Sequence, residues 1–108
     1  MSLTKTYPKA GKTCKVKFEV SAELAKGAKT ARVLGDFNGW NTRSDSSKMK
    51  KNDDGSFTKE IALEQGKEFQ FRYLIDGKRW ENDENADKYV PAPNSPDDNS
   101  IVIVEFAR

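Results

Sequence analysis

Apolar and polar residues alternate along several segments of this chain. Residues 13–20 do so throughout, with Cys14, Val16, Phe18 and Val20 on one side and Lys15, Lys17 and Glu19 on the other. Residues 56–63 and 68–76 repeat this period of two, which predicts strands packed on one face and solvated on the other. Shorter strands are predicted over 30–36 and 101–106. The latter is a nearly continuous β-branched run, expected to be covered on both sides for part of its length.

The phase of the two longer segments assigns their faces. In 56–63, Phe57, Ile61 and Leu63 point inward, with Lys59 on the same side near the sheet edge. Segment 68–76 turns four apolar residues inward and three residues outward: Phe69, Phe71, Tyr73 and Ile75 against Gln70, Arg72 and Leu74. Arg72 is therefore expected to point away from the core.

Turn residues separate the predicted strands. Asp53-Asp54-Gly55, Gln65-Gly66 and Asp76-Gly77 each predict a hairpin reversal. Residues 21–29 are predicted as a loop, because Gly27 follows a possible helical turn too soon. Polar loops are expected over 42–52 and 91–99. The pattern predicts one all-β domain over residues 1–108, an immunoglobulin-like antiparallel β-sandwich, although strand spacing alone does not separate a sandwich from a small barrel.

Composition restricts the possible functions. The 108 residues fit one domain and are too few for a catalytic α/β barrel of about 250 residues. With 19 basic and 17 acidic residues, the net charge of +2 argues against a nucleic-acid partner, and the lysines near the start are interpreted as a solvated strand face. No apolar run approaches the roughly 20 residues of a membrane span, and residues 1–5 show no secretory leader. We expect a cytoplasmic protein with no membrane partner.

The chain contains no histidine and one cysteine, Cys14, which its phase places in the core. The absence of histidine removes Ser-His-Asp and Cys-His arrangements and most zinc sites. The acidic stretch 81–87 resembles the start of a calcium loop but lacks the later glycine and glutamate. It is interpreted as a solvated loop, not as a metal site or a glycosidase acid pair. We therefore expect no catalysis, no metal and no cofactor.

Two tryptophans lie where a core does not require them. Trp40 ends a loop after the second predicted strand, and Trp80 follows the Asp76-Gly77 turn. An indole on a loop rim can stack on the apolar C–H face of a pyranose, while the sugar hydroxyls bond to neighbouring polar side chains. The candidate partners are Arg72, Lys78, Asn38, Asn82 and Asn99. The alternative is that each tryptophan fills a gap at the edge of the sandwich.

The motif that carries Trp40 also has a structural interpretation. Glycine permits backbone conformations that other residues avoid, and Asp and Asn side chains bond to nearby amides. Gly35, Asp36 and Phe37 are accordingly assigned to loop shape and core.

An ordered series of motifs resembles a known family. The chain from about residue 30 to 104 is similar to the glycogen-binding or isoamylase N-terminal (early set) domain, including the glycogen-binding domain of the AMP-activated protein kinase β subunit. The motifs are Gly35-Asp36-Phe37-Asn38-Gly39-Trp40-Asn41, Met49-Lys50-Lys51, Asp54-Gly55-Ser56-Phe57, Gly66, Phe69-Gln70-Phe71-Arg72-Tyr73-Leu74-Ile75-Asp76-Gly77, Trp80-Glu81-Asn82-Asp83, Ala86-Asp87-Lys88-Tyr89-Val90 and Asn99-Ser100-Ile101-Val102.

The resemblance implies an immunoglobulin-like sandwich that binds an α-1,4-linked glucan such as glycogen, starch or a maltooligosaccharide. It assigns sugar contacts to Trp40, Arg72, Trp80 and Asn99. The turn before Trp80 is one residue longer than in the kinase-type module, and Ser95-Pro96-Asp97-Asp98 replaces its apolar residue and threonine. The chain is therefore closer to the enzyme-appended branch.

Three functions remain as hypotheses. The first is a free-standing glucan-binding module. The second is a scaffolding or protein-interaction domain without sugar affinity. The third is a fragment of, or an accessory to, a glucan-processing enzyme such as a glycoside hydrolase.

Overall fold

A computed structural model describes residues 3–9, 11–93 and 95–106. Its strands are β1 (Leu3–Thr6), β2 (Thr13–Val20), β3 (Ala31–Gly35), β4 (Lys50–Lys51), β5 (Phe57–Glu64), β6 (Lys67–Ile75), β7 (Arg79–Glu81), β8 (Lys88–Pro91) and β9 (Asp98–Val104). The short helix α1 spans Ala22–Ala25, and 3-10 turns span Asp36–Asn38 and Asp45–Ser47.

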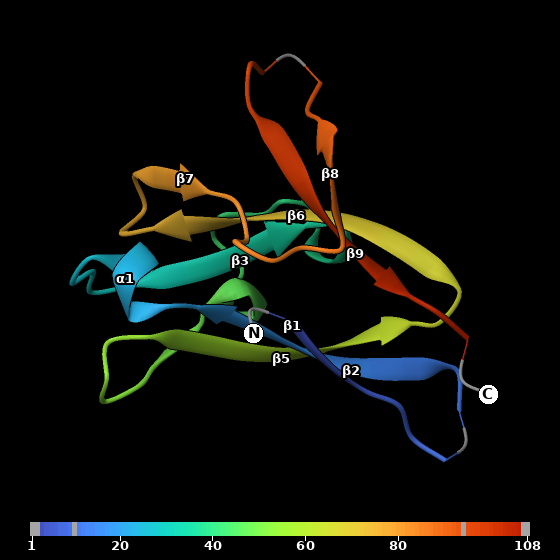
Figure 1. Ribbon diagram of the computed structural model, residues 1–108. Coiled ribbons are helices and arrows are strands. Elements are labelled where there is room, and N and C mark those ends of the chain that lie inside the picture. The colour runs from blue at the N-terminus through green and yellow to red at the C-terminus, as the bar shows by residue number, and fades with distance from the viewer. Residues whose placement is uncertain (1–2, 10, 94, 107–108) are drawn as a thin grey trace.

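The strands form two antiparallel layers (Figure 1). Sheet A has the order β1-β2-β5-β4. Sheet B has the order β3-β6-β9-β8, with β7 paired to the end of β6. The prediction of an all-β antiparallel sandwich is confirmed.

The core lies between the layers, as the alternating pattern predicts. Phe18 from sheet A meets Phe71 from sheet B edge-on, with ring centroids 5.0 Å apart. Cys14 is fully buried in this cluster, as expected. The inward residues predicted for 68–76 are confirmed for Phe71, Tyr73 and Ile75, while Phe69 is partly buried at the margin.

Two local predictions are wrong. Gln65-Gly66 does not close a hairpin: it carries the chain from β5 in sheet A to β6 in sheet B. Residues 21–29 contain the helical turn α1, because the Ser21 hydroxyl caps it by accepting from the Leu24 N–H and Lys26 ends it in a left-handed conformation.

The segments predicted as loops contain some regular secondary structure. The 42–52 segment contains a 3-10 turn and β4, and the 91–99 segment supplies the end of β8 and the start of β9. Residue 94 lies outside the described residues. Strand β8 and the first part of β9 project away from β6 and from the two layers (Figure 1).

Candidate functional site

The outer face of sheet B brings the two tryptophans together. Trp80 lies in β7 directly opposite Leu74 of β6, and 43% of its surface is exposed. Trp40 is half-buried at the end of the loop after β3. The ring centroids of the two indoles are 6.5 Å apart and their planes are inclined by 51°. We call this pair the indole platform.

The backbone of the loop after β3 fixes the orientation of Trp40. Gly39 and Trp40 are both left-handed, with φ of 65° and 57°, and the Trp40 N–H donates to the Gly35 carbonyl at 3.1 Å. Bulky residues rarely adopt this conformation, and such outliers persist only where the surroundings hold them. Asn38 supplies part of that hold, since its amide bonds to the Gly35 N–H and the Val33 carbonyl, both at 3.0 Å.

Asp36 connects the loop to sheet B. One carboxylate oxygen accepts from the Trp40 indole N–H at 3.2 Å, and the other accepts from the Gln70 backbone N–H at 2.8 Å. Gly35 permits this close approach, because a Cβ there would lie 2.3 Å from the Gln70 carbonyl oxygen. The assignment of Gly35 and Asp36 to loop shape is consistent with these contacts, and Phe37 packs against the core with its ring centroid 5.4 Å from that of Phe18.

Beside the platform lies a depression of about 370 Å³. Its lining comes from the loop after β3, from β6 and from the β8–β9 segment: Asp36, Trp40, Gln70, Arg72, Ala92, Pro93 and Asn99. The Arg72 Nε donates to the Asn99 side-chain oxygen, and the Asn99 amide N–H donates to Gln70 Oε1 at 2.8 Å. This chain of bonds uses Nε and leaves the two terminal nitrogens of Arg72 without a hydrogen bond among the described residues.

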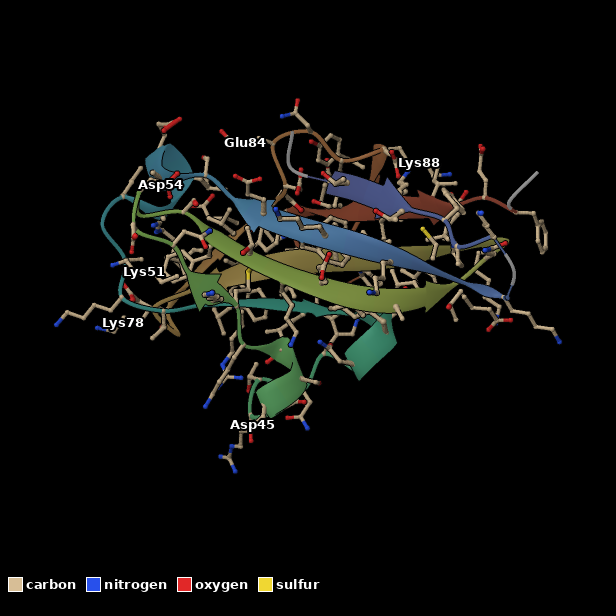
Figure 2. All side chains as sticks on the ribbon, turned by 90° about the horizontal axis from the view of Figure 1, so that it is seen from below. Asp45, Lys51, Asp54, Lys78, Glu84 and Lys88 are labelled. Carbon is tan, nitrogen blue, oxygen red and sulfur yellow. The ribbon has the colours of Figure 1, made fainter. Side chains whose placement is uncertain are left out.

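The remaining predicted residues either lie outside the depression or form hydrogen bonds within the protein. Lys78 is exposed on the β6–β7 turn, at the same end of the sandwich as Lys51 and Asp54 (Figure 2), and does not line the depression. Asn82 donates to the Asp98 carbonyl at 2.8 Å and accepts from the Ser100 hydroxyl at 2.8 Å. Asn38 and Asn82 therefore have their bonds within the protein.

The hairpin that carries Trp80 is pinned to the body of the domain. Asp76 Oδ1 accepts from the Lys29 and Thr30 N–H groups at 2.8 and 3.0 Å. These hydrogen bonds lower the pKa of Asp76 below its ordinary value of 3.8, and the bond from the Thr30 N–H has the larger effect. Arg79 donates to the carbonyls of Leu24 and Ala25, each at 3.1 Å, at the end of α1. Trp80 thus stands on a fixed hairpin.

One member of the acidic stretch is not solvated, contrary to prediction. Asp83 is 2% exposed, and its carboxylate accepts from the Tyr73 phenol at 2.5 Å. The Asp83 N–H donates to the Ser100 hydroxyl at 2.9 Å. Burial, and then the neighbouring Asp83 carboxylate, raise the pKa of Tyr73 well above 10.0. Asp83 thereby links Tyr73 of β6 to Ser100 of β9 on the buried side of these strands. The outer side of the same two strands contributes Gln70, Arg72 and Asn99 to the depression.

Two residues that line the depression were not among the sugar-contact candidates of the sequence. Gln70 lies on the outward face with Arg72 in the same period of two, and that phase was the signal available for it. Asp36 lies four residues before Trp40, a spacing that allows a side chain to reach the indole.

No group of three or more metal-ligand side chains occurs among the described residues. The helices described within 3–106 include none long and apolar enough to cross a membrane. Comparison of the chain with protein-family models and with curated proteins gives no match. The resemblance to glycogen-binding domains thus rests on the sequence motifs alone.

Proposed function

We propose that this domain binds an α-1,4-linked glucan on the indole platform without catalysing a reaction. The observation that carries the proposal is the meeting of Trp40 and Trp80, 6.5 Å apart, beside the bonded group of Arg72, Asn99 and Gln70. Apolar ring faces and directed hydrogen-bond donors are the two elements that a sugar requires.

The tilt of the platform favours a curved chain. α-1,4 linkages turn successive glucose units relative to one another, whereas β-1,4 linkages give a flat ribbon. Two indoles inclined by 51° match two successive sugars of a curved chain better than they match a ribbon. The terminal nitrogens of Arg72, which have no hydrogen-bond partner among the described residues, then donate to sugar hydroxyls at the side of the platform.

The carboxylates near the platform support the part of the proposal that the site binds a sugar without hydrolysing it. Among the described lining residues, Asp36 is the one carboxylate, and its two oxygens bond to Trp40 and Gln70. Glycoside hydrolysis requires a pair of carboxyl groups, one of them protonated. Asp36 is therefore a positioning residue for the indole.

Affinity electrophoresis in gels with and without glycogen tests the proposal. We expect the parent protein to be retarded and Trp40→Ala and Trp80→Ala to migrate as they do without glycogen. Phe106→Ala is the matched control, since Phe106 is an aromatic residue that is 74% exposed away from the depression. Titration with maltoheptaose should give millimolar affinity, near −4 kcal/mol, weakened at least about tenfold by either tryptophan variant.

The same titrations include the result that would overturn the proposal. If a soluble cello-oligosaccharide binds as tightly as maltoheptaose, the curvature argument fails. If neither sugar changes tryptophan fluorescence at millimolar concentration, sugar binding is wrong. The alternative is then a scaffolding domain that docks a glucan-processing enzyme through this rim.

A further inference from the structure

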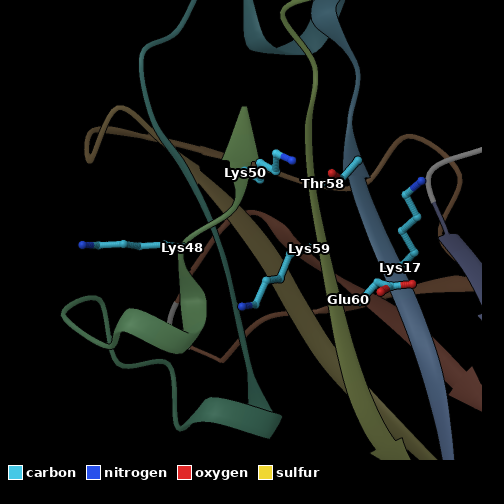
Figure 3. A pocket seen from close by; sticks show the side chains of 6 residues that line it. All are labelled: Lys17, Lys48, Lys50, Thr58, Lys59 and Glu60. Carbon is cyan, nitrogen blue, oxygen red and sulfur yellow. The ribbon is translucent and has the colours of Figure 1, made fainter. Parts of the chain in front are cut away.

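At the β4–β5 edge of sheet A lies a depression that is lined mainly by lysines. Its volume is about 470 Å³, and its lining is Lys17, Lys48, Lys50, Thr58, Lys59 and Glu60. Figure 3 shows Lys17 on the β2 side of β5, and Lys48, Lys50 and Lys59 toward the other side. We call this hollow the lysine groove.

The positive charge of the lysine groove is largely uncompensated. Lys17, Lys50 and Lys59 form no ion pair within the described residues, although Lys17 lies opposite Glu60 in the β2–β5 register. Lys48 pairs with Asp45 at 3.3 Å, but both side chains are mostly exposed. Exposed pairs of this kind contribute little. The lining of the groove therefore contains four lysines and one carboxylate, in a protein whose net charge is only +2.

The lysine groove borders a strand edge that is open. β4 pairs with β5 only at Phe57 and Thr58, because the chain before it bridges to sheet B through Lys48 and Arg32. Across residues 59–63, β5 has no strand partner on this side within the described part of the chain. A second depression of about 250 Å³ continues along the same edge and shares Lys59 and Glu60 with the groove.

We propose that the β5 edge and the lysine groove bind an extended acidic segment of a partner polypeptide, which adds to sheet A as a further strand. The main-chain groups of Glu60 and Ala62, which alternate away from β2, pair with the incoming backbone, and carboxylates of the segment meet Lys48, Lys50 and Lys59. At about 3.3 Å per residue, five residues of edge accommodate about 16 Å of strand. This inference does not rest on glucan binding, because the lysine groove and the depression beside the indole platform share no lining residue.

Two other ligands, a second copy of this chain and a nucleic-acid strand, fit this surface less well. A second copy of this chain would place its lysines opposite those of the first, and like charges across a strand pair are unfavourable. A nucleic-acid strand offers phosphates for the lysines but no partners for the β5 main chain. An acidic peptide satisfies both features.

An amide NMR titration tests the proposal with a synthetic peptide of alternating glutamate and threonine, about ten residues long. We expect shifts concentrated at residues 59–63 and slower hydrogen exchange of the edge amides. Lys50→Glu and Lys59→Glu should each weaken binding at least about fivefold. The matched control is Lys12→Glu, since Lys12 is exposed at the far end of β2 from the groove.

Two further probes separate strand addition from simple charge attraction. A peptide with the same carboxylates but N-methylated at alternate residues should bind at least about tenfold more weakly, because the methyl groups remove the donors that a strand needs. The proposal is overturned if this peptide binds equally well, if Lys12→Glu weakens binding as much as Lys59→Glu, or if a thymidine oligonucleotide binds more tightly than the peptide. These outcomes do not depend on glycogen retention, which is measured separately.

Discussion

Replacing Tyr73 with phenylalanine tests the buried contact between β6 and the segment after β7. The phenol donates to Asp83 Oδ2 at 2.5 Å, Tyr73 is fully buried and Asp83 is 2% exposed. The substitution removes one oxygen and leaves the ring packing intact. Because the Asp83 carboxylate then stays buried with one donor fewer, we expect a loss of about 1.5–3 kcal/mol, the range for hydrogen bonds to charged groups.

This loss corresponds to a measurable shift in melting temperature. An unfolding entropy of about 2.1 cal/mol/K per residue converts it into a decrease in Tm of about 7–13 °C for a chain of this length. Calorimetry and urea unfolding provide the measurement. Tyr89→Phe is the control, since the Tyr89 phenol also donates to Asp83, at 2.6 Å, but to its backbone carbonyl and from a side chain that is 44% exposed. The control should lose less than about 1 kcal/mol.

The pH dependence gives a second measurement for the same contact. The pKa of Tyr73 is raised above the 10.0 expected in the unfolded chain, by burial first and then by Asp83. Its contribution to stability is therefore complete below pH 10 and is lost as pH rises toward the folded-state value. Tyr73→Phe should flatten this alkaline decline. If Tyr73→Phe costs no more than Tyr89→Phe and leaves the decline unchanged, our account of Asp83 as a buried charged acceptor is wrong.

Three other changes test the supports of the site and the core. Gly35→Ala should destabilise the domain by about 1–3 kcal/mol in urea unfolding and weaken glycogen retention, because the new Cβ meets the Gln70 carbonyl at 2.3 Å; unchanged stability would contradict the close approach. Asp76 has a lowered pKa, so the stability it provides is present above pH 3.8 and is lost as pH falls through the folded-state value. Asp76→Asn should flatten that acid decline, and an unaltered decline would assign it to other carboxylates. Cys14 is fully buried and burial raises its pKa, so a disulfide reagent should modify it only as fast as the protein unfolds; rapid reaction in native buffer would refute its core position.

The longer strands were predictable because one face of each is buried. The segments 13–20, 56–63 and 68–76 alternate in phase with the core, and each lies within one residue of β2, β5 and β6 at both ends. β1, β7 and β8 are short and polar, and their pairing with longer neighbours defines them. A local sequence pattern contains no information about such partners, so these three strands were not predicted.

The site divides in the same way. The outward direction of Arg72 and the exposure of Trp80 follow from local periodicity and turn position. The proximity of Trp40 and Trp80 depends on the pairing register of β3, β6 and β7. This register cannot be read from the local sequence pattern. The burial of Asp83 was missed for a similar reason, since its donor Tyr73 is ten residues away on another strand.

The central strand β6 separates two kinds of residue within a single segment. Phe71 and Tyr73 serve the interior, whereas Gln70 and Arg72 face the depression. A designer can thus exchange the outward pair for other polar side chains and leave the interior sequence untouched. The domain is for this reason a suitable starting scaffold for selecting new ligand preferences by mutating alternate positions of one strand.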